Sequence, residues 1–230
     1  MNHNIKIIAD STCDLSEEVI KKHDITVIPL CIVMNEKSYY DGLDITPDQI
    51  FQWSDDNKTT PKTAAITVDR GIEILKPFVQ QGKDIIFIGI SEQMSSTCNV
   101  VRLAREELAY DRIFVIDSMN LSTGIGLQVM RAAEMAIQGK SAEEIVEGIE
   151  NDRAKVKTSF VIDTLVYLAR GGRCSAITAL LANTLKLKPV IVVKNGVMEV
   201  GRKYRGNLDH VLLKYAKDLE PDLRNACPDR

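Results

Sequence analysis

The fold is decided by the stretch Ile85-Ile86-Phe87-Ile88-Gly89-Ile90-Ser91-Glu92-Gln93-Met94-Ser95-Ser96-Thr97-Cys98-Asn99. Its first four residues form a continuous apolar run, which is typical of a strand buried in a parallel sheet. After Asn99, apolar residues return at helical spacing from Val100 to Leu108, which predicts an amphipathic helix. A strand, a polar loop and a helix in this order indicate an α/β protein.

The loop between this strand and this helix carries several hydroxyl groups. Ser95 or Ser96 is placed to cap the helix. Backbone N–H groups at a helix start, together with hydroxyls, favour an anion such as a carboxylate or phosphate. A simpler interpretation is that the serines only cap their own helix, and the local pattern by itself favours that one.

Two further predicted strands end in the pair Asp-Ser. Asp10-Ser11 follows the apolar strand Ile5–Ala9, and Asp117-Ser118 follows Ile113–Ile116. Asp and Ser side chains satisfy loop N–H groups at strand ends. Because strands alternate with helices, we expect a mainly parallel sheet with helices on both faces and these loops at its ligand-binding edge. A metal site built from Asp10 and Asp117 is the less favoured alternative, since no further carboxylate has metal-ligand spacing.

Other helix and strand signals fit the same alternation. Ser16 caps a predicted short helix, Thr46-Pro47 opens another, and Ser141 begins a capping box. The apolar segment Ile25–Val33 predicts a strand in which Pro29 marks a bulge or an edge position. The remaining predicted segments are helices at 68–80 and 122–138 and an exposed loop at 55–63.

The pattern changes near Lys155. Asn195-Gly196 between two apolar runs is a strong hairpin signal, and Gly171-Gly172 is a helix stop. The predicted elements are strands at 156–162, 190–193 and 197–200 and helices at 164–170, 176–187 and 208–219. The sequence therefore predicts an N-terminal α/β domain at 1–154 and a second α/β domain at 155–230 with an antiparallel hairpin.

Composition limits the classes of function. The net charge of −3, from 29 basic and 32 acidic residues, argues against a nucleic-acid partner or a polybasic membrane signal. The five cysteines are widely spaced and include no C-x-x-C pair, which is typical of reduced thiols. No signal peptide is recognisable, and no apolar run reaches the ~20 residues of a membrane span. We expect a cytoplasmic protein with no transmembrane segment.

Motifs for catalysis are missing. The three histidines, His3, His23 and His210, do not follow predicted strands, so Ser95 has no evident base. The sequence contains no G-x-S-x-G elbow, no P-loop and no G-x-G-x-x-G fingerprint. Nothing in these patterns makes a positive case for an enzyme.

Two basic clusters allow two interpretations each. Arg170-Gly171-Gly172-Arg173 lies where a predicted helix ends, and Arg202-Lys203-Tyr204-Arg205-Gly206 follows the hairpin. Cations are favoured by the dipole at a helix end, or they can form a docking point for an acidic partner. Each cluster alone favours the first interpretation.

The motifs taken together resemble the DegV family of bacterial fatty-acid-binding proteins. The match covers nearly the whole chain in order, and several motifs in register are far more specific than one. The matching stretches are Ala9-Asp10-Ser11-Thr12 with Asp14-Leu15, Tyr40-Asp41-Gly42, Lys62-Thr63-Ala64-Ala65-Ile66-Thr67, Ile90 to Asn99, Val115-Ile116-Asp117-Ser118, Tyr167-Leu168-Ala169-Arg170-Gly171-Gly172-Arg173 and Leu185-Lys186-Leu187-Lys188-Pro189.

This resemblance implies a two-domain DegV-like (EDD) fold that holds a long-chain fatty acid between its domains and needs no cofactor or metal. It implies a carrier without enzymatic activity, which presents the carboxylate to an ATP-dependent fatty-acid kinase for phospholipid synthesis. The implied roles are carboxylate binding for Thr63, Ser95, Ser96 and Thr97, loop support for Asp10, Ser11, Asp117 and Ser118, and kinase docking for Arg170 and Arg173.

The sequence also departs from the family pattern. Ala64 stands where Ser is usual, Ile66 replaces Pro, and Glu92 and Ser96 replace small residues. The family's Gly-Thr-His-x-Gly-Pro-Gly motif is absent, so the second domain is expected to be incomplete at its C-terminus. One alternative is an enzyme that acts on a small phosphorylated or carboxylated substrate through Ser95 and Asp117. Another is a remnant without function.

Overall fold

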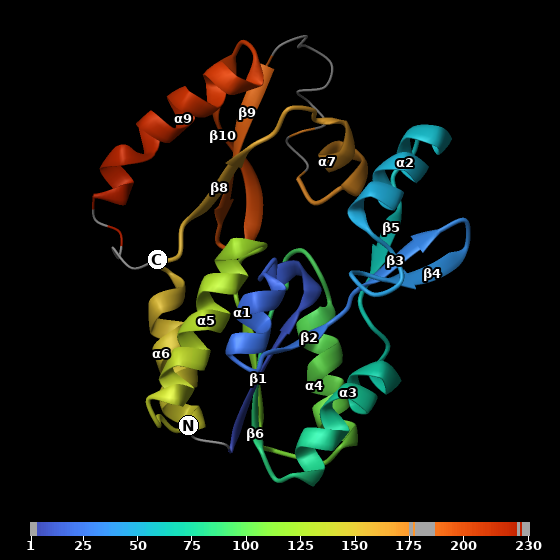
Figure 1. Cartoon of the computed structure of the whole chain (residues 1–230), viewed down its shortest axis with the longest axis vertical. Helices are drawn as coiled ribbons and strands as arrows, with labels where there is room; N and C mark the ends of the chain where they lie inside the picture. Colours follow the sequence, from blue (N-terminus) through green and yellow to red (C-terminus); the bar gives the residue numbers. More distant parts are fainter. Residues whose placement is uncertain (1–3, 175–176, 178–186, 225, 227–230) are drawn as a thin grey trace. The chain divides into compact units, whose positions relative to one another are not determined.

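The computed structural model describes residues 4–174, 177, 187–224 and 226. The chain divides into two compact units, Met1–Lys157 and Thr158–Arg230 (Figure 1). No helix of the described part is long and apolar enough to cross a membrane.

The first unit is built on a four-stranded sheet in which all neighbouring strands are parallel. Its strands are β1 (Ile5–Asp10), β2 (Thr26–Ile28), β6 (Asp84–Gly89) and β7 (Ile113–Asp117), in the order β2-β1-β6-β7. The central strand β6 pairs with β1 on one side and with β7 on the other. Parallel pairing places the carboxyl ends of these strands at one edge.

Helices cover both faces of this sheet, as expected (Figure 1). α5 (Thr123–Ile137) and α6 (Ala142–Arg153) pack on one face, and α3 (Val68–Gln80) and α4 (Thr97–Glu107) on the other. Along β6, Ile86 and Ile88 join the first hydrophobic cluster, while Ile85 and Phe87 join the second. The strand is therefore apolar at every position because both of its faces are buried.

The helix starts follow the local signals. Ser16 caps α1 (Glu17–Lys22), and Thr67 caps α3. Capping boxes at Thr46 and Ser141 begin α2 (Pro47–Asn57) and α6, respectively. In each case the cap side chain accepts a backbone N–H that has no partner inside the helix.

A second, antiparallel sheet in the first unit corrects two sequence predictions. It has the order β4-β3-β5, with β3 (Cys31–Met34), β4 (Lys37–Tyr40) and β5 (Lys62–Ala64). The predicted strand 25–33 is two strands, β2 and β3, because Pro29 has no N–H to continue a ladder. The predicted loop 55–63 is also wrong at both ends, since α2 extends to Asn57 and β5 begins at Lys62.

The second unit contains an antiparallel sheet of the order β10-β9-β8. Its strands are β8 (Thr158–Val161), β9 (Leu187–Lys194) and β10 (Val197–Arg205). Asn195 and Gly196 join β9 to β10 with positive φ angles of 50° and 78°, which is the two-residue turn that their sequence predicts. The mixed α/β fold class with a separate antiparallel sheet is confirmed.

Two helices of the second unit begin close to their predicted positions. α7 (Val166–Gly171) ends at Gly172, whose φ of 72° permits the left-handed stop. α9 (Leu208–Leu223) extends beyond its predicted end at 219. Tyr215 of α9 is hydrogen-bonded to Ser159 of β8, with 2.7 Å between the hydroxyl oxygens. The helix predicted at 176–187 lies largely outside the described residues, and Leu187 itself begins β9.

The core of the first unit can be tested with two leucines. Leu75 is fully buried in the cluster of α3 and α4, whereas the Leu103 residue of α4 is 41% exposed. We expect Leu75→Ala to lower the free energy of unfolding by about 2–5 kcal/mol, through lost burial and a residual cavity. Leu103→Ala should cost well under half as much in the same urea titration. Equal losses would contradict this placement of the core.

Candidate functional site

The carboxyl edge of the parallel sheet brings together three chain segments that are far apart in the sequence. β1 leads into a 3-10 turn at Ser11–Cys13, β6 into the loop Ile90–Ser96, and β7 into the loop Ser118–Ser122. Gly89 at the end of β6 pairs with Asp117 at the end of β7. The loop Ile90–Ser96 is therefore flanked by the other two.

Asp10 connects the end of β1 to the start of this loop. Its Oδ2 accepts the Ile90 N–H at 2.7 Å, and its Oδ1 accepts the Thr12 N–H at 3.0 Å and the Thr12 hydroxyl. The side chain is fully buried. Burial raises the pKa of Asp10, and the hydrogen bonds from Thr12 and Ile90 offset part of the shift. Beside it, the Ser11 hydroxyl accepts the Leu30 N–H at 3.2 Å.

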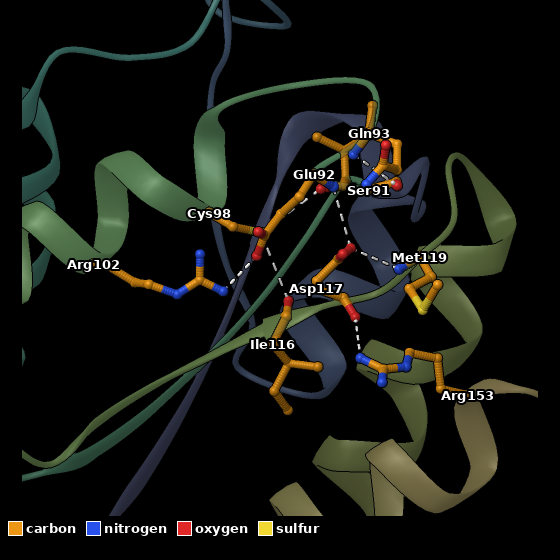
Figure 2. A network of polar contacts seen from close by, with 10 residues as sticks. Ser91, Glu92, Gln93, Cys98, Arg102, Ile116, Asp117, Met119 and Arg153 are labelled. Carbon is orange, nitrogen blue, oxygen red and sulfur yellow. Dashed lines mark hydrogen bonds and ion pairs between the residues drawn. The ribbon is translucent and has the colours of Figure 1, made fainter. Parts of the chain in front are cut away.

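Asp117 holds the same loop from the β7 side (Figure 2). Its Oδ1 accepts the Met119 N–H at 2.8 Å and the Glu92 N–H at 3.3 Å. The neighbouring Ser118 is buried, and its Oγ bonds the backbone of Asn120. Both aspartates thus act on loop N–H groups. Within the described part of the chain, no group of three or more His, Cys, Asp or Glu residues could hold a metal ion.

The loop itself is a tight turn around Ser91. The Ser91 carbonyl accepts N–H groups from Met94 at 2.9 Å and Ser95 at 3.0 Å, and its Oγ accepts the Gln93 N–H. The carboxylate of Glu92 pairs with Arg102 of α4 (Figure 2). This ion pair ties the tip of the loop to the helix that follows it.

The hydroxyls at the start of α4 have different surroundings. Ser96 occupies the cap position but its side chain makes no capping bond. Ser95 Oγ accepts the Thr97 N–H at 3.3 Å and lies 2.8 Å from Thr97 Oγ1. Thr97 is buried, Ser95 is half-buried and Ser96 is exposed. Ser95, and not Ser96, therefore accepts an N–H at the start of α4. Among the hydroxyl residues of positions 91–97, Ser91 and Thr97 are buried, whereas Ser95 and Ser96 are at least partly exposed.

The remaining predicted residues lie on other elements. Thr63 is an exposed residue of β5, opposite Ile32, in the antiparallel sheet of the same unit. Arg170 and Arg173 are exposed in the second unit, and Arg173 Nη1 donates to the Gly171 carbonyl at 2.6 Å. The structure thus gathers Asp10, the 91–97 loop and Asp117 at one edge. It does not place Thr63 on that sheet.

Two supporting residues escape prediction from the sequence. Cys98 is fully buried, and its Sγ lies 3.7 Å from the Ile90 carbonyl oxygen and 3.8 Å from that of Ile116. Burial, with the nearby carboxylates of Asp117 and Glu92, raises the pKa of this thiol, so it stays protonated. A Cβ on Gly89 would come within 2.8 Å of Cys98 Sγ and 2.7 Å of the Phe87 ring. Glycine leaves room for this packing.

Fold and site together define a class of protein: a two-unit α/β protein with a hydroxyl-rich loop at the edge of a parallel sheet. The family model described as "uncharacterised protein, DegV family" matches residues 4–214. A DegV domain-containing protein of Clostridium perfringens is 41% identical over 202 residues, which cover 88% of this chain and 72% of that relative. The chain belongs to the DegV family.

Solved structures give the same result. A fatty-acid-binding DegV family protein of Thermus thermophilus superposes with a TM-score of 0.81 at 29% identity, covering 94% of this chain and 78% of that one. A stearic-acid-binding protein of Eubacterium ventriosum superposes with a TM-score of 0.81 at 30% identity, covering 95% of this chain and 78% of that one.

Asp10 makes the stability of the loop anchor dependent on pH. The pKa of Asp10 is raised above the ordinary 3.8 in the folded chain. The contribution of this raised pKa to the free energy of unfolding is therefore fully present below pH 3.8 and is lost as pH rises through the folded-state pKa. Asp10→Asn removes this titration. We expect the unfolding free energy of wild type minus that of the variant to rise as pH is lowered toward 3.8, measured by urea unfolding across pH.

The matched control is Asp111→Asn, at an exposed turn residue before β7. The same urea titrations of this variant report the effect of removing a carboxyl that lies away from the loop anchor. A difference for Asp10→Asn that stays constant or falls with decreasing pH would show that burial does not dominate at this carboxyl.

Proposed function

We propose that this protein binds a long-chain fatty acid, with the carboxylate held at the loop that begins α4. The observation that supports this most directly is the likeness of the described fold to solved relatives that are described as fatty-acid-binding and stearic-acid-binding proteins. Both are nearly one-third identical to this chain and match more than nine-tenths of it.

The geometry of Ser95 suits a carboxylate. When Thr97 donates its hydroxyl proton and its N–H to Ser95 Oγ, the proton of Ser95 is directed elsewhere and can be donated to a ligand. The N-terminus of α4 adds a favourable dipole for a negative charge. In this proposal Ser95 is the principal donor, the exposed Ser96 adds a second hydroxyl, and the buried Thr97 orients Ser95.

Thr63 is the proposed second contact for the carboxylate. It lies on β5, and the same segment reaches Ile66, which is buried in the hydrophobic cluster that also contains Cys98. The segment with Thr63 and the start of α4 are therefore anchored in one core. Asp10, Ser11, Asp117 and Ser118 keep their proposed role of supporting the loop.

Affinity would come from the acyl chain. Burying about a dozen methylenes contributes roughly 10 kcal/mol at about 0.8 kcal/mol each, before ordering costs. The head group then needs hydrogen-bond donors, and no base.

The surroundings of Ser95 suit a ligand-binding residue better than a catalytic nucleophile. Its hydroxyl is hydrogen-bonded to the hydroxyl of Thr97, and a hydroxyl is not basic enough to activate a serine near neutral pH. Any phosphorylation of the bound carboxylate would be the chemistry of a partner. We propose that the partner is a fatty-acid kinase and that Arg170 and Arg173, both exposed, help to dock it.

Retention of fatty acid provides the test of ligand binding. Purified protein is extracted with organic solvent and analysed by mass spectrometry, and the affinity for palmitate is measured by titration. We expect a long-chain acyl ligand in wild type. Ser95→Ala should weaken palmitate binding by about 1.5–3 kcal/mol because a hydrogen bond to a charged group is lost.

The control for this substitution is Ser141→Ala. It removes a capping hydroxyl of the same kind at the start of α6, which is a different helix. This variant should lose stability and keep its affinity for palmitate. Wild-type protein that neither contains an acyl ligand nor takes up palmitate would contradict the proposed function, and unchanged affinity in Ser95→Ala would leave the loop a helix cap only.

The partner is tested separately. Arg170→Glu should slow phosphorylation of the bound fatty acid by a bacterial fatty-acid kinase, most strongly at low salt, because charges at a docking surface act mainly on association. Its palmitate affinity should equal that of wild type. Lys217→Glu, at an exposed position of α9, is the control. Equal rates for the two variants would remove Arg170 from the docking surface.

A further inference from the structure

Residues 117–122, the end of β7 and the loop after it, touch two segments at once, and we call them the β7 loop. On one side they hold residues 90–96, which we call the ligand loop: Asp117 Oδ1 accepts the Glu92 N–H at 3.3 Å, and the Asn120 carbonyl accepts the Ser91 N–H at 2.9 Å. On the other side it is held by the end of α6. Arg153 Nη1 donates to the Asp117 carbonyl at 2.9 Å (Figure 2). Asp117 takes part on both sides, because its side chain contacts the ligand loop and its carbonyl contacts Arg153.

Asn120 makes a parallel connection. Its side chain is buried, its Nδ2 lies 3.5 Å from the Val156 carbonyl oxygen, and its Oδ1 accepts the Leu121 N–H at 3.2 Å. The backbone carbonyl of the same residue holds Ser91. Asn120 therefore contacts both the ligand loop and the turn after α6, just as Asp117 contacts both the ligand loop and the last residue of α6.

That segment is the covalent link to the second unit. α6 ends at Arg153, a turn follows in which Val156 N–H donates to the Arg153 carbonyl at 3.2 Å, and the second unit begins at Thr158. We call residues 153–157 the linker. Its two contacts with the β7 loop are thus made a few residues before the chain enters the second unit.

The β7 loop is itself constrained. Met119 and Ser122 have φ angles of 51° and 52°, which are unfavourable for residues other than glycine. Gln128 of α5 donates from Nε2 to the Ser118 carbonyl at 3.0 Å. Because a loop held in this conformation has few alternative arrangements, a displacement at one of its contacts is expected to displace its other contacts as well.

We propose that Arg153 is a positioning residue of the ligand loop, acting through Asp117, and that the linker and the ligand loop are thereby coupled. This rests on the proposed function, because the ligand is the fatty acid assigned to that loop. Coupling of this kind is reciprocal: a bound ligand that orders the ligand loop also orders the linker, and displacement of the linker lowers the affinity for the ligand. Occupancy of the ligand site would in this way affect the linker that leads into the second unit.

The test compares Arg153→Met, which cannot donate, with Arg153→Lys, which can. The control is Arg131→Met: Arg131 is similarly half-exposed and lies 3.7 Å from the Asp152 carboxylate, so it contacts the same end of α6 without the β7 loop. In protein stripped of ligand, amide hydrogen exchange is followed by NMR at Ser91 and Glu92, with Ile86 and Ile88 of β6 as internal references.

We expect Arg153→Met to speed exchange at Ser91 and Glu92 by about fivefold relative to β6, as for the loss of one hydrogen bond. Arg153→Lys should restore much of the protection, and Arg131→Met should match wild type. Unchanged exchange in Arg153→Met, or the same increase in Arg131→Met, would overturn the positioning role.

Palmitate tests the coupling. Added palmitate should slow exchange of the Lys155 and Val156 amides in wild type and have little effect on them in Arg153→Met. An equal effect in both proteins, or no effect in palmitate-bound wild type, would overturn the coupling. Wild type that binds no palmitate would instead contradict the proposed function, while exchange in the ligand-free protein would still decide the role of Arg153.

Discussion

The parallel pairing of β6 between β1 and β7 is the constraint on which the rest of the structure depends. A central strand must bury both faces, so helices are required on each side of it, and α3 and α4 oppose α5 and α6 for this reason. The same pairing sets the end of β6 between two other strand ends. The loop after β6 therefore donates backbone hydrogen bonds to groups on both neighbours.

The chemistry of the edge follows from which groups those neighbours provide. Asp10 and Asp117 use their carboxylates on backbone N–H groups, and Glu92 is paired with Arg102. These acidic side chains are thus engaged in structural contacts, and the hydroxyls of the half-buried Ser95 and the exposed Ser96 lie at the start of α4. Such an arrangement suits the anionic head group of the proposed ligand.

Much of the fold could be predicted because its signals are local. The helix start at Thr46-Pro47, the capping box at Ser141 and the turn at Asn195-Gly196 each depend on residues within three positions, so the sequence reveals them directly. Predictions failed where pairing partners are distant. β5 is short and exposed, and it exists because Thr63 pairs with Ile32 across the sheet, which no local pattern of polar residues indicates.

The sequence by itself determined the alternation of strands and helices around the parallel sheet, the caps at Ser16 and Ser141, the turn at Asn195-Gly196, and the hydroxyl-rich character of the loop before α4, because these follow from short-range periodicity and hydrogen bonding. The tertiary structure alone decided how that loop is held. Asp10 reaches Ile90 across 80 residues, and Arg153 reaches Asp117 across 36. Such contacts arise only when buried strands and helices pack, because packing brings together groups that the linear chain keeps apart.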